Sequence, residues 1–315
     1  MDCIRRAVID VGTNSVKLLV ADVTGRQVAP VQEESQQTRL GKDFYETQVL
    51  QPEAVTRTAQ AVAHLAGKAR ARQAAAIRVI ATSAARDAKN PGDLVAAIRA
   101  AASLPTEIIS GEQEAEWSFQ GVSTETRFAG SSLLILDVGG GSTEFILGRD
   151  CHRFLARSFP LGTVRQLEKS RLSNPPTTAE YAASRAALHT YLRDEVQPQL
   201  AAVLAGDALP APLQLVGTGG TTSLLARMEL RLATFDREAI EGVQLSLARM
   251  EALRDQLWKL SLEERQHLPG LPANRADVIL TGIAIYTAVM EVFALPSLSI
   301  STRGLRFAAV LEDQP

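Results

Sequence analysis

The sequence has few cysteines, few histidines and no long apolar run. Its 315 residues include two cysteines, Cys3 and Cys151, and four histidines. Two cysteines cannot form a disulfide framework or a thiolate metal site, and the histidines lack the spacing of metal ligands. No apolar run reaches the ~18–20 residues that a membrane span requires. These absences argue against a zinc protein, a disulfide-rich secreted domain and a membrane-spanning chain.

An excess of charge of one sign is also missing. The 33 basic and 35 acidic residues leave a net charge of −2, which argues against a globally basic nucleic-acid binder but leaves a local basic cleft open. A hydrophobic content of 46% and a charged content of 22% are typical of globular proteins and exclude disordered, collagen-like and coiled-coil chains. No targeting segment precedes the first strand-like run, so we expect a cytoplasmic protein.

The length predicts two domains, with a one-domain barrel as the alternative. Apolar runs of strand length alternate with amphipathic stretches rich in Ala, Leu and Arg, which indicates an α/β protein. We expect strands at 79–82, 107–109, 133–136 and 213–216, and helices at 52–72, 93–102, 177–197 and 247–259.

One pattern occurs twice in the chain. Residues 7–20 read AVIDVGTNSVKLLV and residues 134–147 read LILDVGGGSTEFIL, so a shift of 127 positions places Asp10 on Asp137. Each copy predicts a β-hairpin whose first strand ends in an aspartate. Two copies in matching places indicate two related domains facing each other across a cleft. We expect the domains to span 1–126 and 127–315, with packing of the last segment onto the first domain as an alternative.

The turns of these hairpins are suited to binding phosphate. Their small residues allow backbone N–H groups to approach an anion, and an aspartate before each turn can hold Mg²⁺. The alternative is a pair of ordinary hairpins whose glycines only satisfy turn geometry. The candidate phosphate-binding residues are Thr13, Asn14, Ser15, Gly139, Gly140, Gly141 and Ser142, and the candidate metal ligands are Asp10 and Asp137.

A third glycine-rich segment follows the strand expected at 213–216. Gly217, Gly219 and Gly220 precede a helix expected at 223–230. Free N–H groups at a helix amino terminus bind anions, although many strand-to-helix turns use glycine for geometry alone. These glycines are further candidates for phosphate binding.

Two acidic residues are candidates for catalysis. Glu112, Glu114 and Glu116 begin a helix, and at about 100° per residue Glu114 points away from the other two. Glu114 can therefore face a cleft, unless all three acids only favour the helix amino terminus. Glu144 lies in the strand after the second turn, where the first copy has Lys17. Glu144 is a second candidate acid/base or metal ligand.

Arginine supplies most of the positive charge, since only six of the 33 basic residues are lysines. Arginine binds phosphate bidentately, although such a bias also follows from genome composition. Arg86, Arg303 and Arg306 stand beside small polar residues and are the arginines most suited to a phosphate site.

The chain resembles the exopolyphosphatase/guanosine pentaphosphate phosphohydrolase family over nearly its whole length. The matching segments are IDVGTNS at 9–15, ATSAARDA at 81–88, ISGEQEA at 109–115, LDVGGGSTE at 136–144, PLGTVR at 160–165, GTGGTT at 217–222, NRADVILTG at 274–282 and STRGLR at 301–306. The resemblance implies the α/β fold of the actin/Hsp70/sugar-kinase superfamily, with two ribonuclease-H-like domains and an active site between them. It also implies Mg²⁺-dependent hydrolysis of a terminal phosphoanhydride, with Mn²⁺ as an alternative metal.

The resemblance also implies roles for particular residues. Glu114 corresponds to the family's catalytic base, which activates water. Asp137 and Glu144 correspond to its essential acids, with Asp137 near the metal. Asn14, Ser15 and the turn at 139–142 correspond to its phosphate-binding turns, and Arg86 to a phosphate-contacting arginine.

The chain departs from the family pattern in two places. Phe307 and Ala308 follow Arg306 where members often have Glu-Gly, and no His-Asp pair is present. We therefore expect a short two-domain form, without the helical extension of longer members, and a homodimer by resemblance. The expected substrate is inorganic polyphosphate, with guanosine pentaphosphate as the alternative. A kinase of the same fold and a non-catalytic nucleotide or polyphosphate sensor remain open.

Overall fold

The computed structural model describes residues 2–206, 209–210 and 212–312. The chain forms two compact units, one of residues 1–124 with 303–315 and the other of residues 125–302. The main chain therefore passes between the units twice, at 124/125 and at 302/303. The boundary expected at 126/127 lies two residues later than the first of these passages, and it assigned residues 303–315 to the second domain. No helix within the described residues is both long and apolar enough to cross a membrane.

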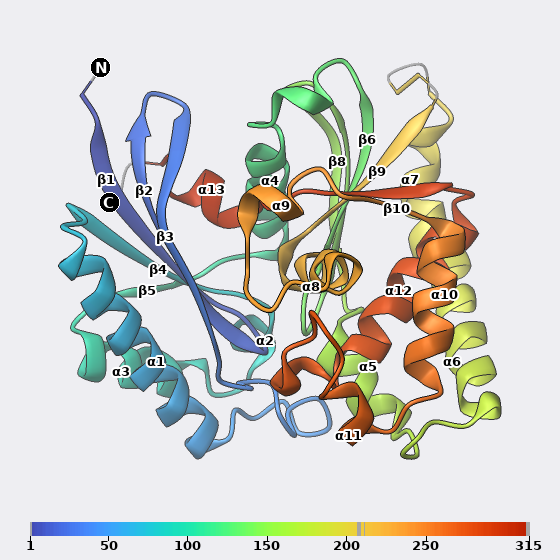
Figure 1. Ribbon diagram of the computed structural model, residues 1–315. Helices are drawn as coiled ribbons and strands as arrows, with labels where there is room; N and C mark the ends of the chain where they lie inside the picture. The colour runs from blue at the N-terminus through green and yellow to red at the C-terminus, as the bar shows by residue number, and fades with distance from the viewer. Residues whose placement is uncertain (1, 207–208, 211, 313–315) are drawn as a thin grey trace. The chain divides into compact units, whose positions relative to one another are not determined.

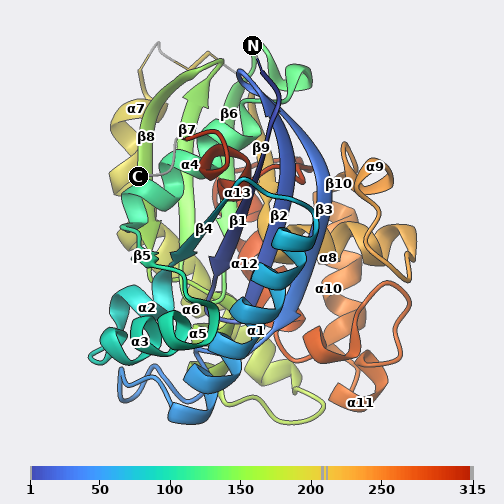
Figure 2. The same ribbon diagram turned by 90° about the vertical axis from the view of Figure 1, so that its left-hand side faces the viewer.

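The first unit is built on a five-stranded sheet in the order β3-β2-β1-β4-β5. β1–β2 and β2–β3 pair antiparallel, whereas β1–β4 and β4–β5 pair parallel; Figure 2 shows β1, β2 and β3 side by side. The elements of this unit are β1 (Ile4–Val11), β2 (Ser15–Thr24), β3 (Gln27–Gln37), α1 (Pro52–Ala71), β4 (Ala76–Ala81), α2 (Ser83–Asp87), α3 (Pro91–Ala102), β5 (Thr106–Ile108), α4 (Gly111–Val122) and α13 (Leu305–Ala309) (Figure 1).

Both faces of the central strands β1 and β2 are largely buried, because alternate strand residues pack against different helices. Ile9 packs in a core cluster with residues of α1 and α3, whereas Val8 packs in a cluster with Trp117 of α4 and residues of α13. Asp10, two positions after Val8, therefore lies on the face of α4 and α13.

The last segment belongs to the first unit because α13 completes the core on that face. Phe307 is buried with Val8. Arg306 donates a hydrogen bond to the carbonyl of Leu18 (2.8 Å), and Arg303 donates one to the hydroxyl of Thr124 (3.0 Å). Both of these arginines, singled out from the sequence, thus hold the last segment to the first unit.

The second unit repeats this sheet and adds one strand. Its order is β10-β11-β9-β6-β7-β8, and β8-β7-β6-β9-β11 matches β3-β2-β1-β4-β5 in order and direction. The repeat seen in the sequence is therefore also a repeat of topology. The strands are β6 (Ser132–Val138), β7 (Thr143–Arg149), β8 (His152–Phe159), β9 (Leu213–Thr218), β10 (Gln244–Ser246) and β11 (Ser297–Ile300).

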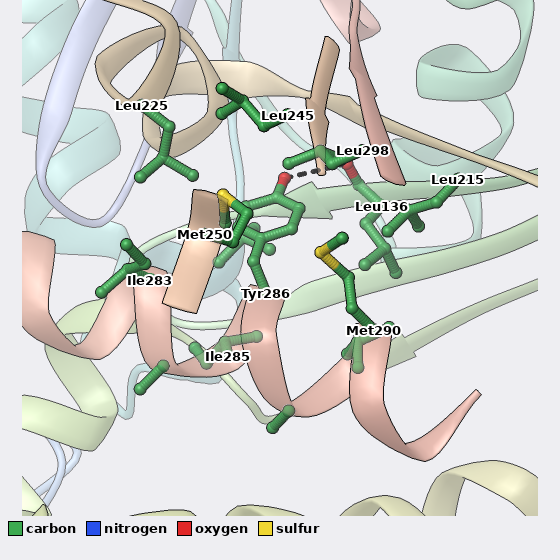
Figure 3. Close-up of a cluster of buried hydrophobic side chains, with 14 of the residues drawn as sticks. Leu136, Leu215, Leu225, Leu245, Met250, Ile283, Ile285, Tyr286, Met290 and Leu298 are labelled. Atoms are coloured by element: carbon green, nitrogen blue, oxygen red, sulfur yellow. Dashed lines mark hydrogen bonds between the residues drawn. The ribbon is translucent and has the colours of Figure 1, made fainter. Parts of the chain in front are cut away.

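Helices pack against this sheet, and their buried side chains form one hydrophobic core cluster with those of the strands. The helices are α5 (Thr163–Ser170), α6 (Thr178–Tyr191), α7 (Gln197–Leu204), α8 (Gly219–Leu230), α9 (Arg237–Ile240), α10 (Leu247–Trp258), α11 (Leu262–Arg265) and α12 (Ile279–Val292), with short turns at Thr126–Phe128, Leu192–Val196 and Ala273–Arg275. α12 is buried all round, and its Tyr286 lies among Leu136, Leu225 and Met250 in Figure 3. The Tyr286 hydroxyl hydrogen-bonds with Thr222 and with the Leu136 carbonyl, and burial raises its pKa.

The expected helices occur, although α3 begins at Pro91 rather than at 93 and two others differ more. α6 begins after Thr177, which forms a capping box with Glu180, as Ser/Thr-x-x-Glu predicts. The helix expected over 177–197 is interrupted by a π-helical turn at Leu192–Val196. α8 begins at Gly219 rather than Ser223, because the glycines form its first turn instead of a preceding loop.

A polar cluster in the second unit joins the residues next to both chain passages. Glu125 accepts hydrogen bonds from Arg127 and Ser301, and Arg127 also donates to Glu241. Burial raises the pKa of Glu125 to about 7, and hydrogen bonding with Glu241 acts in the same direction. The pKa of Glu241 is lowered, because hydrogen bonds from Glu125 and Thr302 outweigh its burial. Folded Glu125 therefore keeps a proton that the unfolded chain releases between about pH 4.5 and 7, and the free energy of unfolding falls as pH rises through this range.

Candidate functional site

The two hairpin turns have the same closing geometry. The Gly12 N–H donates to the Ser15 carbonyl at 3.0 Å, and the Gly139 N–H donates to the Ser142 carbonyl at 3.0 Å. A Cβ atom would lie 3.2 Å from that carbonyl oxygen at Gly12 and 3.1 Å at Gly139, so a side chain would crowd the turn at either position. The turns predicted from the sequence are therefore equivalent in this backbone hydrogen bond and in the Gly and Ser residues that form it.

Each turn is held by the segment that follows the third strand of its unit. In the first unit, Gly41 N donates to the Thr13 carbonyl (2.8 Å), and Thr38 N and Arg39 N donate to the Asn14 carbonyl (3.1 and 3.0 Å). We name residues 38–41 the first supporting segment. These bonds hold the Thr13 and Asn14 carbonyls so that they point to the first supporting segment.

The second supporting segment, residues 161–165, does the same for the second turn. Thr163 N donates to the Gly139 carbonyl (2.9 Å), and Val164 N and Arg165 N donate to the Gly140 carbonyl (2.8 and 3.1 Å). The Nε atom of Arg165 donates to the Gly141 carbonyl (2.8 Å). All three glycine carbonyls of the turn thus point to this segment.

A glycine in each supporting segment permits the close approach. A Cβ on Gly41 would lie 2.3 Å from the Thr13 methyl group, and one on Gly162 would lie 2.4 Å from the Gly140 carbonyl oxygen. Sequence reasoning missed both roles. The signal was a Leu-Gly dipeptide after the third strand of each half, at 40–41 and 161–162.

Glu114 is held by Arg86 in the first unit. α4 is capped by Ser110, whose hydroxyl accepts from Gln113 N, and this start places Glu114 on the buried side of the first turn at 7% exposure while Glu112 is exposed. The helical phase predicted that Glu114 and Glu112 face different ways, whereas Glu116, expected on the same face as Glu112, is half-buried. Arg86 Nη1 contacts Glu114 Oε2 at 3.0 Å and donates to the Ile109 carbonyl at 3.1 Å. The guanidinium therefore orients the carboxylate, whereas its contact with phosphate stays a prediction.

Four polar residues form a row across the second sheet. Glu144 pairs with Asp137 and with Ser158 in the neighbouring antiparallel strands, and Thr218 pairs with Asp137 in the parallel strand. Side chains that pair directly project from the same face of a sheet. The Ser158 hydroxyl donates to Glu144 Oε1 at 2.7 Å. We name Ser158, Glu144, Asp137 and Thr218 the polar row; the sequence predicted only its two acids.

The amino terminus of α8 lies against Asp137. Gly219 has a φ of +84°, and a Cβ there would lie 2.2 Å from Asp137 Oδ1. A carboxylate is favourable at a helix amino terminus. Gly217 also packs closely, with its Cβ position 2.8 Å from the Thr222 methyl group. Phosphate binding by Gly217, Gly219 and Gly220 stays a prediction, since these contacts already account for glycine at two of the three.

The oxygen atoms of the polar row are of the kind that binds a hard cation. Asp137 and Glu144 are both buried, and the buried Thr218 hydroxyl has no hydrogen-bond partner among the described residues. Mg²⁺ prefers oxygen ligands and commonly takes one or two carboxylates together with water and phosphate oxygens. Within the described part of the chain no group of three or more His, Cys, Asp or Glu side chains could hold a metal, and the third predicted ligand, Asp10, belongs to the first unit. Asp137 and Glu144 therefore fit such an ion as a two-carboxylate site.

Comparison with known proteins gives a consistent result. The sequence pattern that defines the Ppx/GppA phosphatase family matches residues 19–314 of this chain. Exopolyphosphatase 2 of Mycobacterium tuberculosis is 34% identical over 296 residues, which cover 89% of this chain and 88% of that protein. An exopolyphosphatase structure from Cytophaga hutchinsonii is 26% identical with a TM-score of 0.85, covering 96% of each chain. The Aquifex aeolicus Ppx/GppA structure is 27% identical with a TM-score of 0.78, covering 98% of this chain and 97% of that one. The fold is thus the two-domain α/β fold of actin-like proteins that the sequence predicted.

Proposed function

The chain belongs to the Ppx/GppA phosphatase family, and on this premise we propose that it is an exopolyphosphatase, which hydrolyses the terminal phosphoanhydride of inorganic polyphosphate with Mg²⁺ and releases orthophosphate. The names of the Mycobacterium tuberculosis and Cytophaga hutchinsonii relatives support polyphosphate as the substrate. The alternative within the family is the 5′-phosphohydrolysis of guanosine pentaphosphate, which ends in the same anhydride.

The observation that carries the proposal is the repeated turn. In each turn the carbonyls are bound by the supporting segment, and successive backbone N–H groups of such turns form anion-binding concavities. An anion-binding turn in each unit is the kind of feature that suits a substrate carrying phosphate groups. The aspartate next to the last residue of the strand before each turn adds a carboxylate that could hold Mg²⁺.

Hydrolysis requires a base for water and compensation of the phosphate charge. Phosphoryl transfer leaves the protein mainly positioning and electrostatic stabilisation to supply. Glu114, oriented by Arg86, would accept the proton of the attacking water, and the glycine turn would hold phosphate oxygens through backbone N–H groups. A Mg²⁺ ion held by Asp137 and Glu144 would neutralise charge on the phosphate oxygens. Ser158 fixes the Glu144 carboxylate for this task.

The test is phosphate release from long polyphosphate, short polyphosphate, guanosine pentaphosphate and ATP with Mg²⁺. Glu114→Gln should lower turnover by ~10²-fold or more because it removes the base, and substrate binding should persist. Glu112→Gln, two residues earlier on the same helix and exposed, is the matched control and should keep wild-type turnover.

The outcomes separate the candidate functions. Phosphate release that is faster from polyphosphate than from guanosine pentaphosphate supports the proposal. The opposite order moves the assignment to the alternative. Wild-type turnover in Glu114→Gln would remove Glu114 from the mechanism. Release from none of the substrates would contradict the hydrolase proposal and favour a kinase or a sensor.

A further inference from the structure

The second turn contains two adjacent glycines where the first has Thr13 and Asn14. Glycine has more backbone freedom than any other residue, so Gly140 and Gly141 do not define their own peptide orientations. In the first turn, Asn14 has a side chain that accepts a hydrogen bond from Gln37 (3.1 Å). Gly140 and Gly141 have no side chain that could accept such a bond, so the orientation of their peptides depends on bonds to their carbonyls alone.

The second supporting segment supplies those bonds. Backbone N–H groups hold the Gly139 and Gly140 carbonyls. The Gly141 carbonyl is held by a side chain, Arg165 Nε at 2.8 Å, and in the described residues no other donor to it is found. The segment is anchored in the core, because Thr281 of α12 donates to the Thr163 carbonyl at 2.8 Å.

The direction of a carbonyl fixes the direction of the next N–H. The C=O and N–H of one trans peptide point in opposite directions, so carbonyls bound to the supporting segment turn the N–H groups of Gly140, Gly141 and Ser142 away from it. Among the described residues, the N–H groups of Gly140 and Gly141 have no acceptor. Arg165 controls the last of these peptides, the one that carries the Ser142 N–H.

We propose that Arg165 is a positioning residue: its hydrogen bond to the Gly141 carbonyl holds the Gly141–Ser142 peptide so that its N–H faces the bound phosphate. This inference rests on the proposed function, since it assigns the residue that organises the second phosphate turn. In this role Arg165 acts on the substrate through the turn. Its loss should therefore weaken phosphate binding more than it slows the chemical step.

The test compares Arg165→Met and Arg165→Lys with Lys169→Met. Lys169 lies in the same helix and is exposed, so its replacement removes the same charge without touching the turn. Hydrogen bonds to charged donors are strong enough that Arg165→Met should raise KM for short polyphosphate by about tenfold or more. Its kcat should stay within about threefold of wild type, and Lys169→Met should match wild type in both constants. A melting temperature near that of wild type shows that each variant is folded.

Arg165→Lys keeps the charge but lacks the planar donor fork, so its KM should also rise. An unchanged KM in Arg165→Lys would show that charge suffices and would overturn the hydrogen-bonding role. A KM within twofold of wild type in Arg165→Met, or a fall in kcat with KM unchanged, would also overturn it. If wild type releases no phosphate, the proposed function fails; if wild type is active and both Arg165 variants equal it, this inference alone fails.

Discussion

Gly219→Ala should separate the position of Asp137 from the general stability of the second unit. At a φ of +84°, an alanine costs ~1–2 kcal/mol because its Cβ crowds the backbone. The new Cβ would also stand 2.2 Å from Asp137 Oδ1, so the carboxylate must move by on the order of 1 Å. Displacement from the α8 amino terminus should add up to ~1 kcal/mol.

Gly130→Ala is the matched control. Gly130 lies in the same unit with a φ of +76°, and a Cβ there would meet no atom within 4 Å. Alanine at position 130 should therefore destabilise the protein only through its unfavourable backbone conformation. The unit spans residues 125–302, which is 302 − 125 + 1 = 178 residues, and for this size ~2–4 °C of melting temperature corresponds to 1 kcal/mol. Both variants should melt a few degrees below wild type, with Gly219→Ala the lower.

Activity should distinguish the two variants more strongly. A shift of about 1 Å in a site can cost ~10²-fold in rate, so Gly219→Ala should lose phosphate release by about that factor while Gly130→Ala stays near wild type. Phosphate release and thermal unfolding are measured on the same preparations. If Gly219→Ala melts like Gly130→Ala and keeps wild-type release, the close approach of α8 does not set the position of Asp137.

Three further measurements test other parts of the structure. Glu125→Gln should remove the fall in the free energy of unfolding between pH 5 and 7, which in wild type amounts to about 3 kcal/mol at most. Denaturant unfolding at several pH values measures this fall. An equal slope of the free energy of unfolding against pH in both proteins would contradict the raised pKa of Glu125. Asp137→Asn should raise the Mg²⁺ concentration needed for half-maximal phosphate release, and an unchanged titration would remove Asp137 from the metal site. Tyr286→Phe should destabilise the protein by about 1–3 kcal/mol, because a buried hydroxyl that hydrogen-bonds with Thr222 is lost; an unchanged melting curve would refute that contribution.

Features that depend on neighbours along the chain could be predicted from the sequence. The phase of α4 indicated that Glu114 points away from Glu112, and the helix expected to start at 177 begins at Thr178. The repeat predicted both hairpins with their aspartates in equivalent positions, because a strand, a tight turn and a second strand are local structure.

Features that join distant parts of the chain could not be predicted from the sequence. Thr218 lies 218 − 137 = 81 residues after Asp137, and only the pairing of β9 with β6 places it beside that acid. The contact of Arg86 with Glu114 likewise depends on how α2 and α4 pack in the first unit.

The residues proposed to carry out the chemistry can therefore be recognised from local sequence patterns. The residues that hold them in place cannot. An aspartate at a strand end, small residues in a turn and an acid in a first helical turn are recognisable because their geometry follows from backbone bonds between near neighbours. Gly41, Gly162 and Arg165 became interpretable only in the folded chain, because a glycine needed for close approach has no signature until the partner that approaches it is known. Packing between segments remote in sequence sets those partners, and with them the orientation of the peptides that we propose bind phosphate.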